Sequence, residues 1–254
     1  MEKFIKTGCI ICMLFLIGAL IFQAAGSQIL VSANASGKEL PIYCVETDNP
    51  QIALSFDAAW GADDTSIILE ILETHGVKAT FFMTGDWVSS YPEEVKAIAA
   101  AGHDLGNHSE NHKHMTELSD SECQSELMSV HEKVKELTGV DMFLFRPPYG
   151  DYDNHVITNA QACGYYAIQW DVDSLDWKNY GVQSIVDTVL NHKNLGNGSI
   201  ILCHNGADHT AEALDGLITG LKEKGYEFVP ISQLIIKDHY HIDFTGRQIP
   251  DSDS

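Results

Sequence analysis

The chain has 254 residues, 44% of them hydrophobic and 20% charged, which is enough for one substantial globular core. Its 15 Lys and Arg residues face 36 Asp and Glu residues, for a net charge of -21. This balance excludes nucleic acid as a partner and disfavours anionic membrane surfaces, because both need cationic side chains.

The first 35 residues resemble a secretory signal. Two lysines precede an apolar run from Gly8 to Phe22, and small residues follow around Ala35. The run is shorter than the ~20 residues that a membrane span usually needs. We therefore expect cleavage after Ala35 and export to the cell wall or medium. An uncleaved anchor on the outer face of the membrane is the alternative, and only then would the membrane be a partner.

Residues 51–236 alternate apolar, β-rich runs with amphipathic segments. The runs are residues 52–56, 78–84, 103–107, 142–145, 165–170, 199–203 and 226–229. Apolar residues at helical spacing fill the gaps between them, and strand followed by helix, repeatedly, predicts a parallel sheet in one α/β domain. A leader at 36–50 precedes this domain. A polar, acidic tail at 237–254 follows it, and we expect that tail to be loosely ordered.

Helix boundaries can also be predicted. Ser119 with Glu122 forms the pattern of a helix start, Gly139 follows the same segment as a stop signal, and Pro92 lies near the start of another helix. The four cysteines beyond the signal, Cys44, Cys123, Cys163 and Cys203, are scattered. We expect buried free thiols rather than a disulfide framework or a thiolate zinc site.

Five polar residues directly follow predicted strands. They are Asp57, His108, Arg146, Asp171 and His204. Barrel enzymes assemble their sites at the carboxyl ends of several strands at once. The pattern therefore predicts one site, although each residue alone could be an ordinary surface group.

The stretch GNHSENHKH, residues 106–114, places His108 and His112 four residues apart. On one helical turn the two rings would point the same way and could hold one ion, with Zn–N near ~2.0–2.1 Å. An isolated pair at this spacing is weak evidence, but its position after a strand favours a metal site. We expect His103 to serve structure and His114 to be exposed.

Asp57 lies in LSFDAAWG, where a strand enters a turn. A carboxylate there could act as a general base on water. The alternative is a carboxylate at a helix N-terminus, a role that Asp63 and Asp64 fit better.

Two further segments could complete a catalytic site. In FRPPYGDYD, Arg146 could pin a carboxylate, and the backbone N–H of Tyr149 could face a developing oxyanion. In ILCHNG, His204 could protonate a leaving amine, with Asp173 or Asp176 holding a histidine in one tautomer. Trp177 could form a wall for a sugar or simply pack in the core.

In chain order these motifs resemble the polysaccharide deacetylase (NodB-homology) domains of carbohydrate esterase family 4, over roughly residues 51–236. The matching pieces are SFD (55–57), HSENH (108–112), RPPYG (146–150), DSLDW (173–177) and ILCH (201–204). The resemblance implies a distorted (β/α)7-type barrel and metal-dependent N-deacetylation of amino sugars in peptidoglycan or a chitin-like polymer. FDAAWG is most similar to the PdaB-type sporulation deacetylases.

The resemblance also implies roles for individual residues. The catalytic group is Asp57 as base, His204 as acid, Arg146 restraining the base and Tyr149 donating a backbone N–H. The implied metal ligands are His108 and His112, for zinc, with cobalt as the alternative ion. Asp173 and Asp176 would support the site, and the substrate-binding set is Trp60, Trp177, Tyr149 and Leu202.

One position departs from the family pattern. The second aspartate of the usual TFDD motif, a metal ligand, is replaced by Ala58. Asp63 or Asp64 could replace it, waters could fill the shell, or metal binding could be weak or lost. A carbohydrate-binding pseudoenzyme is therefore the alternative function, and the oligomeric state stays open.

Overall fold

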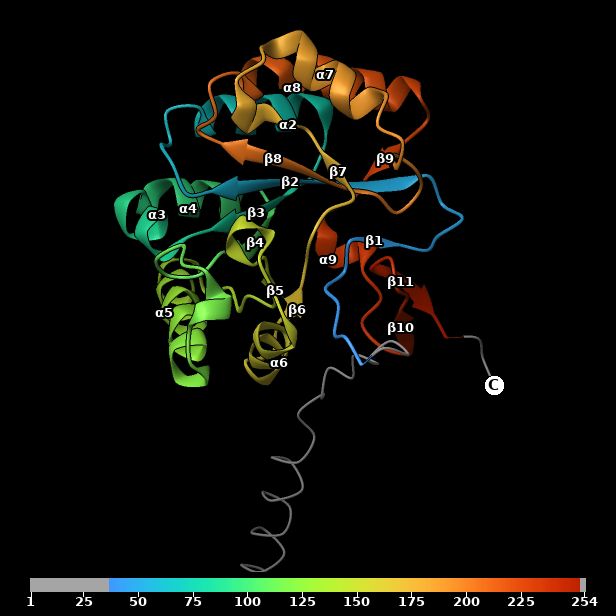
Figure 1. Ribbon diagram of the computed structural model, residues 1–254. Coiled ribbons are helices and arrows are strands. Elements are labelled where there is room, and N and C mark those ends of the chain that lie inside the picture. The colour runs from blue at the N-terminus through green and yellow to red at the C-terminus, as the bar shows by residue number, and fades with distance from the viewer. Residues whose placement is uncertain (1–36, 252–254) are drawn as a thin grey trace, which may run out of the picture.

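The computed structural model describes residues 37–251, and the predicted signal segment lies outside them. Seven strands form an all-parallel half-barrel in the order β6-β5-β4-β3-β2-β8-β7 (Figure 1). Their bounds are β2 Gln51–Ala58, β3 Thr80–Met83, β4 Asp104–Asn107, β5 Leu144–Phe145, β6 Tyr166–Ala167, β7 Val172–Asp173 and β8 Ile200–Asn205. The predicted α/β class and the seven-stranded, barrel-like parallel sheet are confirmed.

Helices cover the outside of the half-barrel, with α2, α7 and α8 beside β2 and β8 and with α5 and α6 beside β4 to β6 (Figure 1). Their bounds are α2 Thr65–His75, α3 Gly85–Ser90, α4 Pro92–Ala100, α5 Asp120–Thr138, α6 Asn154–Ala162, α7 Val182–Leu190, α8 Thr210–Glu223 and α9 Ile231–Leu234. The predicted boundaries hold. Ser119 and Glu122 form a reciprocal capping box, Gly139 ends α5 with a left-handed φ of 75°, and Pro92 opens α4.

Two strand assignments differ from the prediction. The run at 226–229 forms only β9, Glu227–Phe228, which pairs with the first residues of β2 and stands off the main strand path. The seventh strand of the half-barrel is instead β7. Its two residues are too few to show a period in the sequence, so only the sheet itself reveals it.

The two ends of the described chain form a second, three-stranded sheet. β1 (Cys44–Val45) pairs in parallel with β11 (Arg247–Pro250), and β11 pairs in antiparallel fashion with β10 (Tyr240–Ile242). The expectation of a loosely ordered tail is wrong. Tyr240 and Ile242 alternate into the core, a signal that the polar composition of the tail hides.

The leader fits between two strands of the half-barrel. The Ile42 N–H donates to Ala167 O at 2.8 Å beside β6, and the Val45 N–H donates to Gly198 O at 3.0 Å ahead of β8. Ile42 and Val45 are also buried in the core under this end of the sheet. The leader is thus part of the folded domain.

The cysteine prediction is confirmed for Cys44, Cys123 and Cys203, which are buried free thiols. Cys163 is also a free thiol, but it is only half-buried, so the expected burial is wrong for this residue. Between residues 37 and 251, no helix has the length and apolar character needed to span a bilayer.

Candidate active site

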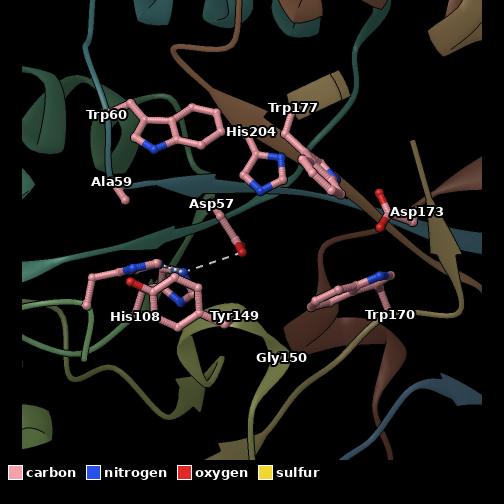
Figure 2. Close-up of a pocket in the computed structure, with 11 residues that line it drawn as sticks. Asp57, Ala59, Trp60, His108, Tyr149, Gly150, Trp170, Asp173, Trp177 and His204 are labelled. Carbon is pink, nitrogen blue, oxygen red and sulfur yellow. Dashed lines mark hydrogen bonds and ion pairs between the residues drawn. The ribbon is translucent and has the colours of Figure 1, made fainter. Parts of the chain in front are cut away.

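A cavity of about 530 Å³ opens at the carboxyl ends of the central strands (Figure 2). Adjacent strands β2 and β8 bring Asp57 and His204 into register as neighbours. The lining residues are Asp57, Ala59, Trp60, His108, His112, Tyr149, Gly150, Trp170, Asp173, Trp177 and His204. The structure therefore brings most of the predicted site residues together.

Arg146 holds Asp57 from below the cavity floor. Its Nη1 lies 2.6 Å from Asp57 Oδ1, and its Nη2 donates to Ser55 Oγ at 2.9 Å. Arg146 is fully buried, and its guanidinium lies 4.1 Å from the centre of the Phe82 ring. This restraint leaves one oxygen of Asp57 for chemistry in the cavity.

The charge state of Asp57 follows from these neighbours. Burial favours the neutral carboxyl, but Arg146, His108 and His204 together favour the ionised form and lower the pKa below its usual value. Asp57 is therefore present as the carboxylate, the form that a general base requires.

His108 and His112 are neighbours in the cavity lining, with their Nε2 atoms 3.2 Å apart. The His108 Nδ1 lies 2.7 Å from the backbone oxygen of Arg146, which fixes the proton on Nδ1 and leaves a lone pair on Nε2. The expectation that these two residues lie on one turn of a helix is wrong. The two residues lie in a loop after β4, and His112 has a left-handed φ of 51°.

Hydrogen bonds hold this loop in its strained shape. Ser109, with φ of 66°, donates its N–H to Asn107 Oδ1 at 2.9 Å and accepts from the His112 N–H at 3.0 Å. The buried carboxylate of Glu126 on α5 accepts from the N–H and side-chain amide of Asn111, each at 2.8 Å. These contacts, rather than helical geometry, make the two imidazoles converge.

His204 is paired with Asp176, which settles which of the two candidate aspartates contacts it. Asp176 Oδ1 lies 2.8 Å from His204 Nδ1, and Oδ2 accepts from the Thr210 hydroxyl at 2.6 Å. Burial lowers the pKa of His204, but the bond and charge of Asp176 outweigh it and raise the pKa above its usual value. Asp173 instead lines the cavity wall.

Aromatic side chains surround these polar groups. Trp60 stacks on the His204 ring with centroids 5.0 Å apart, and Trp177 and Tyr149 line the rim, each about half-exposed or more. Trp170, which the sequence did not single out, forms another wall (Figure 2). Flat apolar surfaces beside polar groups suit a sugar ring.

Four residues do not take part as expected. Asp63 is exposed and away from the cavity, and both oxygens of Asp64 accept from the Gly206 N–H at 3.0 Å. Leu202 is buried in β8 and does not line the cavity. Asp171 follows a strand but bonds the Ser199 hydroxyl at 3.0 Å, outside the catalytic cavity. Neither Asp63 nor Asp64 supplies a third ligand.

The donors present fit two ligands of a metal site. His108 and His112 offer neutral imidazole nitrogens, because burial lowers both pKa values, that of His112 to about 4. Ala58 is fully buried in the apolar core and carries no donor. Across residues 37–251, no group of three or more His, Cys, Asp or Glu side chains is arranged to hold an ion.

Comparisons with known proteins identify one family of similar sequences. Residues 45–168 match the polysaccharide deacetylase family model. The chain is 36% identical to the uncharacterized protein YlxY of Bacillus subtilis, over 77% of this chain and 60% of YlxY. It is 35% identical to the peptidoglycan-N-acetylmuramic acid deacetylase PdaA of the same organism, over 77% of this chain and 75% of PdaA.

A solved structure with a similar fold is that of BA3943, a CE4 family pseudoenzyme from Bacillus anthracis. It is 34% identical to this chain with a TM-score of 0.74, over 78% of this chain and 69% of that one. A BA3943 mutant with restored enzymatic activity matches equally well, at 36% identity and a TM-score of 0.74. Neither comparison identifies a PdaB subgroup.

Proposed function

Because this chain belongs to the polysaccharide deacetylase family, we propose that it removes N-acetyl groups from amino sugars of a cell-wall polysaccharide, peptidoglycan in the first place. One observation carries this proposal. An ionised Asp57 and a His204 paired with Asp176 face the same aromatic-walled cavity as a pair of imidazoles. Base and acid thus lie on neighbouring strands, where one substrate can reach both.

Asp57 is the general base. Arg146 holds one oxygen of its carboxylate, and the other lies 3.5 Å from His108 Nε2, at the edge of the cavity. From there it takes the proton of the water that attacks the acetamide carbon. A divalent ion held by His108 and His112, zinc by preference and cobalt as the alternative, would polarise the acetamide carbonyl and lower the pKa of the attacking water.

His204 is the general acid. Asp176 keeps its ring oriented and its pKa raised, so the imidazolium is available to protonate the departing nitrogen. The products are acetate and a free amino sugar. We also propose that the backbone N–H of Tyr149 stabilises the developing oxyanion, a role supported by the position of Tyr149 in the cavity lining and by its left-handed φ of 61°.

We also propose a cellular location and a family subgroup for this protein. The N-terminal signal pattern supports export to the cell wall or the outer face of the membrane. The FDAAWG stretch supports a PdaB-type role in sporulation.

A second candidate function follows from Ala58. With two imidazoles and no third protein ligand among residues 37–251, the site is one short of the usual catalytic zinc set. The likeness to BA3943 adds support for a pseudoenzyme that binds glycan without turnover. In that case the aromatic walls are the functional part of the cavity.

Acetate release from peptidoglycan by the purified domain, with and without added zinc, distinguishes the two functions. We expect turnover with zinc, and the Ala58→Asp variant should bind zinc at least about tenfold more tightly, equivalent to about 1.4 kcal/mol. Ala100→Asp, which adds the same charge at an exposed position of α4 away from the cavity, is the control. Glycan binding without acetate release in the wild type, with release in Ala58→Asp, would establish the pseudoenzyme instead.

A further inference from the structure

A second cavity, of about 640 Å³, adjoins the catalytic one. The two share Trp170 and Asp173 as lining residues, so a polymer that leaves the first cavity past Trp170 enters the second. Its other walls come from both chain ends and from a loop, and they include Tyr43, Lys193 and Arg247. No motif described above accounts for these three residues.

Cationic side chains gather in this cavity although the protein is strongly acidic. Arg247 and Lys193 both line it, and His192 lies beside them. Lys193 forms no ion pair with any residue between 37 and 251. Arg247 contacts Glu46 at 3.2 Å, but Glu46 is more than half-exposed and such pairs contribute little. Both cations are therefore available to an anionic ligand.

Both acidic residues of the cavity are hydrogen-bonded to the protein. Asp171 accepts from the Ser199 hydroxyl at 3.0 Å and from the Ile200 N–H at 2.9 Å, and Asp173 Oδ1 accepts from the Leu175 N–H at 2.8 Å. Burial also raises the pKa of Asp171 to about 6, which reduces its negative charge in mildly acidic conditions. Arg247 and Lys193 are the side chains of this cavity that can pair with an anionic ligand.

We propose that this second cavity binds a carboxylate carried by the polymer unit next to the acetylated sugar, with Arg247 as the specificity residue. The inference rests on the proposed function and narrows the class of substrate. A peptidoglycan strand carries such carboxylates on its lactyl groups or peptide stems, whereas a chitin-like polymer carries none. Arg is suited to this role because its planar fork matches a carboxylate.

Binding of defined tetrasaccharides, followed by tryptophan fluorescence and calorimetry, tests the proposal without requiring turnover. The ligands are a peptide-free peptidoglycan tetrasaccharide, its methyl ester, a peptide-bearing form, and an N-acetylglucosamine tetramer. We expect the wild type to bind a free-acid form about fivefold more tightly than the ester or the neutral tetramer. A preference for the peptide-free form identifies the lactyl carboxylate as the group that is bound. A preference for the peptide-bearing form identifies a carboxylate of the peptide stem.

Arg247→Gln should abolish this preference and leave affinity for the neutral tetramer unchanged. Lys96→Gln is the matched control, because Lys96 is also an exposed cation paired with a glutamate, Glu93, on helix α4 away from both cavities. Equal affinity of the wild type for acid and ester overturns the proposal, whatever the variants do. Acetate release tests the proposed function separately. The affinities for the acid and the ester can be compared whether or not the protein releases acetate.

Discussion

The pairing of His204 with Asp176 makes one aspartate responsible for the state of the proposed acid. Asp176→Asn keeps the size of the side chain but removes the charge that raises the pKa of His204. We expect the His204 pKa to fall, so the alkaline limb of the activity profile moves to lower pH and turnover drops on the order of 100-fold. Histidine titration by NMR measures the shift even without turnover.

Asp173→Asn is the control, since Asp173 bonds Leu175 rather than His204. It should move the His204 titration much less. An unchanged His204 pKa in Asp176→Asn would contradict the role given to Asp176.

His103 should make stability depend on pH. Burial and the nearby Lys78 lower its pKa to about 4, and its Nδ1 accepts from the Ala79 N–H at 3.1 Å. The folded-state pKa lies below the ordinary 6.5, so the unfolded chain binds the proton first as pH falls. The stabilisation is complete above about pH 6.5 and is lost toward about pH 4.

Urea denaturation across this window measures the effect. In His103→Gln, the free energy of unfolding should fall less between about pH 6.5 and about pH 4 than in the wild type. The difference in this fall between the two proteins is due to His103 alone, because carboxyls such as Asp171 are present in both. The raised pKa of Asp171 has the opposite effect and stabilises the folded state as pH falls. Parallel curves would contradict the prediction, and His239→Gln, at an exposed site, should leave the slope unchanged.

The loop after β4 depends on α5 for its shape. Glu126 accepts two bonds from Asn111 and one from Lys113 at 2.9 Å, next to the proposed ligand His112. Glu126→Gln replaces one acceptor oxygen with a donor, so the loop should loosen and zinc affinity should fall about tenfold. Competition with a coloured chelator measures this.

Glu122→Gln, on the same helix but in the exposed capping box, is the control and should leave zinc affinity unchanged. Equal zinc affinity in Glu126→Gln and the wild type would show that the loop holds its shape without the clamp.

The elements differ in how well the sequence predicts them. Runs such as 52–56 and 199–203 become β2 and β8 because short, nearly continuous apolar runs are typical of strands that are buried on both faces of a parallel sheet. The loop carrying His108 and His112 could not be predicted, since its left-handed residues are stabilised by Asn107 and α5, which are brought there by the fold. The choice of Asp176 over Asp173 has the same cause, because both lie in one motif and only the backbone of η3 (Asp176–Lys178) turns one of them toward His204.

In the molecule as a whole, Gln248 joins the tail sheet to the rest of the domain. It is fully buried, accepts from the Ile236 N–H at 2.9 Å and donates to the Ile236 carbonyl at 2.6 Å. Gln248→Ala leaves both backbone groups without these partners, so the free energy of unfolding should fall by about 2 kcal/mol. Chemical denaturation measures it, with the exposed Gln233→Ala as the control. Equal stability of the two variants would mean that water replaces the lost bonds.

The parallel pairing of Cys44 with Arg247 also has a consequence for biogenesis. This contact joins residues that are far apart in the sequence, so it cannot form until the strand that carries Arg247 has been synthesised. An emerging polypeptide must wait for β10 and β11 before it can complete this sheet, and contacts so distant in sequence are slow to form. The same pairing that closes this sheet in the folded domain therefore leaves the sheet unfinished in the nascent chain until Arg247–Pro250 have been added.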